Sequence, residues 1–188
     1  MTDLSPEQIA SAFEPTVTAA SHCVASRRPF SASADFAINK PAGQACPKLA
    51  PEFRCGIHSS LRRQGFAGCT VYDCFAAGQQ VCQVTFGGLD WRAAPESAQQ
   101  MFEVFAIMRD LHELAWYLTE ALTLQAARPL RGELSPALVK IGQLIGQRSE
   151  ALLGLDMSEV RQRCQCPAPG RERACPGQSQ AQEGPPGS

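Results

Sequence analysis

A run of apolar residues at helical spacing is the feature that most constrains the fold of this 188-residue chain. Between positions 95 and 122, apolar side chains return every three or four residues and acidic side chains line the other side. The apolar stripe comprises Met101, Val104, Phe105, Met108, Leu111, Ala115, Leu118 and Leu122. Residues three and four apart share one face of an α-helix, so this spacing predicts a long amphipathic helix with a buried stripe.

A second helix is expected over residues 136–153, where the apolar positions are Leu138, Ile141, Leu144, Ile145 and Leu152. Arg128-Pro129 lies between the two patterns and is expected to end the first helix. Because a short connection makes consecutive helices antiparallel, residues 95–163 are predicted to form a helical hairpin. His112, in the first helix, is expected to be a buried histidine with a hydrogen-bond partner.

Residues 23–94 differ from this helical half, since they are rich in cysteine and glycine and lack sustained helical periodicity. One short helix is expected near residues 59–64, stopped by Gly65. Residues 81–86 alternate in polarity before Gly87-Gly88 and predict a strand of a short β hairpin, with Cys82 in the core. An irregular segment of this length needs an organiser other than secondary structure, and metal cross-linking is one.

The two ends of the chain carry weaker signals. Residues 1–22 contain an apolar stripe interrupted by Pro15 and predict one short N-terminal helix. Residues 164–188 are rich in proline and glycine and predict a disordered tail. The expected fold class is therefore mainly α: an irregular Cys-rich segment cross-linked by metal, with a short β hairpin, and a helical hairpin packed on it.

Composition and charge exclude several functional classes. With 17 basic and 18 acidic residues, the formal net charge of −1 gives no electrostatic case for nucleic acid or a membrane surface as partner. No apolar run approaches the roughly 20 residues of a membrane span, and the acidic, polar N-terminus is unlike a secretory signal. A cytoplasmic location is expected. No phosphate-binding loop is present and no thiol catalytic site is indicated, so the protein is expected not to be an enzyme.

Cysteine is unusually frequent for such a protein. The nine cysteines are Cys23, Cys46, Cys55, Cys69, Cys74, Cys82, Cys164, Cys166 and Cys175. A reducing cytosol disfavours disulfides, so grouped thiols there indicate metal or redox chemistry. Gaps of 8, 13 and 4 residues separate the four cysteines from position 46 to position 74, and loops of that length can bring their sulfurs together. Spacing alone favours a metal site over buried apolar cysteines and leaves both open.

Several motifs in this segment resemble known families. Cys46-Pro47-Lys48-Leu49, Cys55-Gly56-Ile57-His58 and Cys69 with Tyr72-Asp73-Cys74 resemble the core of the bacterial CxxCxxCC family of zinc- or iron-chelating domains. Residues 33–43, 65–75, 83–88 and 101–114 resemble the N-terminal region of bacterial pentapeptide-repeat proteins. The resemblance covers about residues 22–155, and the chain carries no run of the repeats themselves.

The resemblance implies a metal site and its ligands. The candidate ligands that match the family's downstream cysteines are Cys46, Cys55, Cys69 and Cys74. Cys23 is the first candidate for an additional ligand. The implied cofactor is one zinc or iron ion with a structural role, because four protein ligands leave no open position. His58 and the cysteines after position 163 are expected to stay outside the site. An iron–sulfur or thiol redox protein is an alternative, as is an interaction module for an unknown protein partner, such as a pentapeptide-repeat protein.

Overall fold

The computed structural model describes residues 29–164 and is mainly helical, as predicted. From residue 77 onward its helical elements are α2 (Ala77–Gln79), η6 (Gln80–Thr85), α3 (Ala98–Thr123), η7 (Gln125–Leu130), α4 (Arg131–Ile145), α5 (Ser149–Leu153) and α6 (Met157–Cys164). Three short 3-10 helices precede them: η3 (His58–Ser60), η4 (Arg62–Gln64) and η5 (Ala67–Thr70). The expected N-terminal helix over residues 1–22, Cys23 and the expected tail from residue 165 onward lie outside the described residues.

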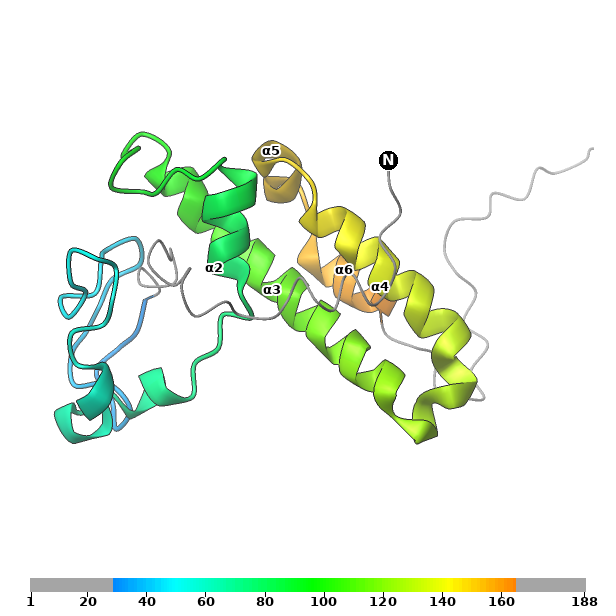
Figure 1. The fold of residues 1–188 in the computed structure, drawn as a ribbon, viewed down its shortest axis with the longest axis horizontal. Helices are drawn as coiled ribbons and strands as arrows, with labels where there is room; N and C mark the ends of the chain where they lie inside the picture. The colour runs from blue at the N-terminus through cyan, green and yellow to red at the C-terminus, as the bar shows by residue number, and fades with distance from the viewer. Residues whose placement is uncertain (1–28, 165–188) are drawn as a thin grey trace, which may run out of the picture.

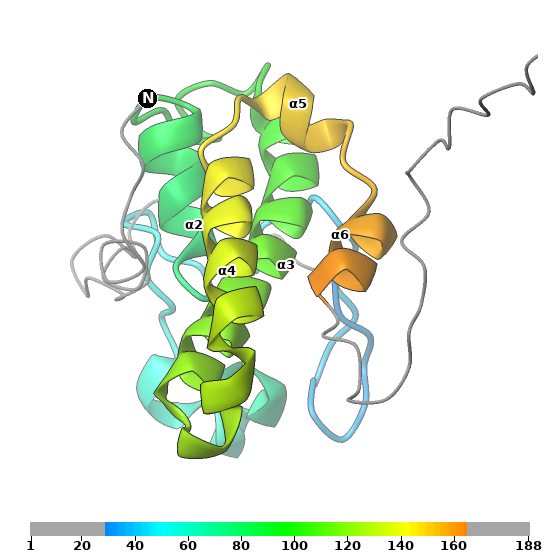
Figure 2. The same cartoon turned by 90° about the vertical axis from the view of Figure 1, so that its right-hand side faces the viewer.

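The long helix α3 is the axis of the helical part. As Figure 1 shows, α4 runs back beside α3 in the opposite direction, while α2 and η6 lie against the first half of α3. Figure 2 shows α5 and α6 following α4 and completing the layer around α3. Seven residues of the predicted stripe are buried, from Met101 to Leu118, and Leu122 is half-buried. No helix within residues 29–164 combines the length and apolar character needed to cross a membrane.

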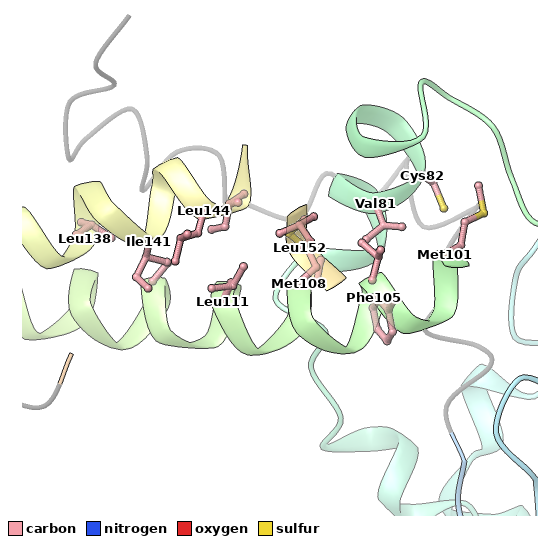
Figure 3. Packing of buried hydrophobic residues seen from close by; sticks show 14 of the residues in the cluster. Val81, Cys82, Met101, Phe105, Met108, Leu111, Leu138, Ile141, Leu144 and Leu152 are labelled. Atoms are coloured by element: carbon pink, nitrogen blue, oxygen red, sulfur yellow. The ribbon is translucent and has the colours of Figure 1, made fainter. Parts of the chain in front are cut away.

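Apolar side chains from four elements interlock along α3. Figure 3 shows Leu111 of α3 facing Ile141 and Leu144 of α4, and Leu152 of α5 lying beside Met108. Leu111, Met108 and Leu152 are completely buried. Fully burying a side chain of this size contributes about 1.5–3 kcal/mol. Packing of this kind, rather than a sheet, therefore holds the helical part together.

The second helix differs from its predicted extent of residues 136–153. Helix α4 already begins at Arg131, because buried Leu134 brings an earlier turn into the core, and Pro136 lies inside it. The helix ends at Ile145, where the Gly146 amide donates to the carbonyl of Gly142 at 3.2 Å. A turn then starts the separate helix α5, which carries Leu152 to α3.

The predicted β strand over residues 81–86 is wrong. This segment is the π-helical η6, in which the Phe86 amide donates to the carbonyl of Val81 at 2.9 Å. Val81 and Cys82 are adjacent and both buried, whereas Val84 is 63% exposed. A strand would place Val81 and Cys82 on opposite faces, but a helical turn lets both point at α3. The expected burial of Cys82 is confirmed.

The Cys-rich segment from residue 29 to 76 has little regular structure. Its only extended pairings are two isolated antiparallel bridges, Phe30 with Lys40 and Leu49 with Cys55. The rings of Phe30 and Phe36 stack at 4.4 Å between centroids. Gly65 ends η4 with a φ of 78°, a left-handed conformation that glycine adopts without strain, which confirms the predicted stop.

Candidate functional site

A cavity of about 550 Å³ opens in the Cys-rich segment, and three of the predicted ligands line it: Cys46, Cys55 and Cys69. The rest of the lining is Pro29, Phe30, Asp35, Phe36, Lys40, Lys48, Leu49, His58, Leu61, Gly68, Val71 and Tyr72. The cavity thus joins residues from both bridges and from several of the loops between positions 29 and 72. Of the predicted ligands, these three thiols share one cavity wall.

Backbone hydrogen bonds fix the first two cysteines. The Leu49 amide donates to the carbonyl of Cys46 at 2.9 Å, so Cys46 opens a tight turn. Leu49 then pairs with Cys55 in an antiparallel bridge, and the Gly56 amide donates to the carbonyl of Lys48 at 2.8 Å. The turn and the bridge therefore hold Cys46 and Cys55 on neighbouring stretches of one small loop.

His58 belongs to the same loop. Its amide donates to the carbonyl of Cys55 at 3.3 Å as the chain enters η3, and both side chains line the cavity. His58 is exposed and Cys55 is half-buried. The sequence favoured a place for His58 outside the site, but this exposed side chain lines the cavity with the cysteines. Cys55 and His58 thus form a Cys-x-x-His pair at the cavity wall.

Cys69 reaches the cavity from η5. Its amide donates to the carbonyl of Phe66 at 3.1 Å, and the preceding Gly68 amide donates to the carbonyl of Asp35 at 3.1 Å. Partial burial raises the pKa of the Cys69 thiol, and negative charge on Cys46 and Cys55 raises it further, against the opposing effect of Lys40. Cys46 and Cys55 therefore lie close enough to Cys69 to affect its thiol electrostatically.

The sequence interpretation missed two lysines in this site. Lys40 is only 4% exposed; its ammonium donates to the carbonyl of Gln44 at 3.0 Å and lies 5.2 Å from the centroid of the Phe30 ring. Lys48 lines the same cavity from the Cys46 turn. The chain has only three lysines against fourteen arginines, and two of the three line this cavity. That scarcity was the sequence signal that could have identified them.

Cys74, the fourth predicted ligand, is not part of the cavity lining. It is half-buried and packs against the helical core. Phe75 and Ala76 follow it with φ values of 50° and 60°, which turn the chain into α2 and toward α3. Across residues 29–164, no three or more histidine, cysteine or acidic side chains are grouped as they stand in a way that could hold a metal ion.

His112 anchors this part of the chain to α3. It is 2% exposed, and its Nδ1 lies 2.7 Å from the carbonyl oxygen of Phe75. Burial lowers the pKa of His112 to about 4, with the Phe75 carbonyl acting in the opposite direction. The imidazole is therefore neutral at neutral pH and donates its Nδ1–H to that carbonyl. The expectation of a buried, hydrogen-bonded histidine is confirmed.

Comparison with known proteins gives one curated relative. The chain is 48% identical over 139 residues to uncharacterized protein YybG of Bacillus subtilis (strain 168). The match covers 74% of this chain and 49% of that protein, so the chain spans about half the length of the curated relative it matches. No family model matches the chain. No solved structure matches it either.

Proposed function

We propose that this chain is a metal-binding protein in which Cys46, Cys55, Cys69 and His58 hold one zinc or iron ion with a structural role. The observation that carries the proposal is that three thiols, from positions 46, 55 and 69, line one cavity. The resemblance of the same motifs to zinc- or iron-chelating domains supports it as well.

The chemistry of these side chains suits a soft divalent cation. Three cysteines and one histidine are a common ligand set for structural zinc. Thiolate repulsion, which contributes to the raised pKa of Cys69, becomes attraction when a divalent cation sits among the sulfurs. Binding would release protons from the thiols and add on the order of 10 kcal/mol to folding. The segment with the least regular secondary structure would gain the most from that contribution.

His58 takes the place of Cys74 in this ligand set. His58 lines the cavity with the three cysteines, whereas Cys74 packs against the helical core. To bring Cys74 into the site, the loop after Tyr72 would have to move away from α3. That movement would break the hydrogen bond between His112 and the Phe75 carbonyl. Cys23 stays a candidate for an additional ligand.

Elemental analysis of the purified full-length chain tests the proposal. We expect about one equivalent of zinc or iron in the wild type and loss of most of it in Cys46→Ser, Cys55→Ser and Cys69→Ser. Cys74→Ser is the matched control and should keep the metal. Less than about 0.2 equivalents in the wild type, together with a fold unaffected by chelator, would refute metal binding.

The same preparation distinguishes a single structural metal ion from an iron–sulfur cluster. An iron–sulfur protein purified without oxygen would be brown, with visible absorbance and acid-labile sulfide in addition to iron. A single structural zinc ion would leave the protein colourless. If Cys74→Ser loses metal and His58→Asn keeps it, the original four-cysteine ligand set is correct and the one proposed here is not.

A further inference from the structure

The cavity beside the three cysteines is much larger than one ion needs. Its volume of about 550 Å³ falls within the range of roughly 300–1,000 Å³ that is typical of small-molecule sites. We infer that it binds a small organic carboxylate with an apolar, planar body. This goes beyond the proposed function, because it depends on the walls and lysines of the cavity and not on a bound metal.

The walls of the cavity are mainly apolar and aromatic. Phe30 and Phe36 form a stacked pair on one side, and Tyr72, Leu49 and Leu61 contribute further apolar surface. The Phe36 ring is pressed against Gly68, where an added Cβ would lie only 2.4 Å from it, so this ring is held in position. Aromatic rings held in this way give the wall a fixed shape against which a planar apolar ligand can pack.

The cavity holds cationic groups that can pair with an anion. The lining holds two ammonium groups, from Lys40 and Lys48, against one carboxylate, from Asp35. Lys40 is buried and already donates to the Gln44 carbonyl. Lys48 is exposed, and among residues 29–164 its ammonium makes no hydrogen bond or ion pair. Lys48 is therefore the group available to pair with a ligand carboxylate, with Lys40 adding positive potential from behind.

Isothermal titration of the full-length chain with 2-naphthoate tests this inference. Its uncharged analogue, 2-naphthamide, has the same ring system and separates the effect of charge from that of the apolar body. We expect saturable binding of the acid, at least about tenfold tighter than the amide, since a charge-assisted hydrogen bond is stronger than one between neutral groups. Lys48→Gln should remove that preference, whereas the matched control Lys140→Gln on α4 should keep it.

A second pair of variants tests the position of the site. Val71 lines the cavity and is 78% exposed, so Val71→Asp should leave the fold intact and weaken 2-naphthoate binding at least tenfold. Val84 is 63% exposed and does not belong to the cavity lining, so Val84→Asp should have no effect. No saturable binding, equal binding of acid and amide, or equal losses in Val71→Asp and Val84→Asp would each overturn the inference.

Metal content, measured on the same samples, keeps the two proposals apart. Lys48→Gln and Val71→Asp remove no metal ligand and should contain as much zinc or iron as the wild type. If 2-naphthoate fails to bind a fully metal-loaded protein, the ligand inference falls and the metal site stands. If it binds a chain that contains no metal, the metal proposal falls and the ligand inference stands.

Discussion

Protonation of His112 should destabilise the fold as the pH falls below neutral. The imidazole is 2% exposed and donates from Nδ1 to the Phe75 carbonyl, and burial lowers its pKa from 6.5 to about 4. The unfolded chain therefore takes up this proton at a higher pH than the folded chain does. The stability linked to neutral His112 is complete above pH 6.5 and is lost as the pH falls toward 4.

The size of the effect follows from the two pKa values. At 1.36 kcal/mol per pH unit, the interval between 6.5 and about 4 corresponds to about 3 kcal/mol. Urea unfolding of wild type and His112→Asn at several pH values between 4 and 7.5 measures it. Asparagine places an amide donor near the position of Nδ1 and does not titrate, so the stability difference between the two proteins should change by about 3 kcal/mol across this range.

Two controls test whether this pH dependence comes from His112. Acidic side chains also titrate below pH 5, but they do so in both proteins and cancel in the difference. His58→Asn, which replaces an exposed histidine instead of the buried one, is the matched control and is measured over the same pH range. Parallel loss of stability in wild type and His112→Asn would show that His112 is not held neutral by burial.

Two further predictions concern packing. Gly68→Ala should cost about 1–3 kcal/mol in the free energy of unfolding, because the new methyl group meets the Phe36 ring, whereas Gly132→Ala has nothing within 4 Å and should cost nothing. Leu152→Ala should cost about 2–5 kcal/mol, because this side chain is completely buried between α5 and α3, while Leu153→Ala, at 37% exposed, should cost less than 1 kcal/mol. Chemical denaturation of the four variants checks both, and equal losses within either pair would contradict the packing described here.

Helix α3 shows how far local pattern reaches. Its stripe repeats over many turns, so the pattern alone predicted which residues are buried and that His112 is among them. The residues from 81 to 86 are too few for such averaging: alternation over six positions fits a strand, yet contact with α3 turns them into η6. Packing against α3 also explains why the second helix differs from its predicted extent. Burial of Leu134 starts α4 early, and burial of Leu152 belongs to the separate helix α5.

The cysteines show more clearly what the sequence alone could not predict. Their number and their loop spacing predicted a shared site, and three of them, Cys46, Cys55 and Cys69, line one cavity. Which thiols gather depended on paths through space: the chain turns toward α3 after Tyr72, taking Cys74 to the core, and the loop from Cys55 brings in His58. Periodicity and composition act on neighbours along the chain and are readable from it. The partners of a loop residue come from elsewhere in the chain, so only three-dimensional packing selects them.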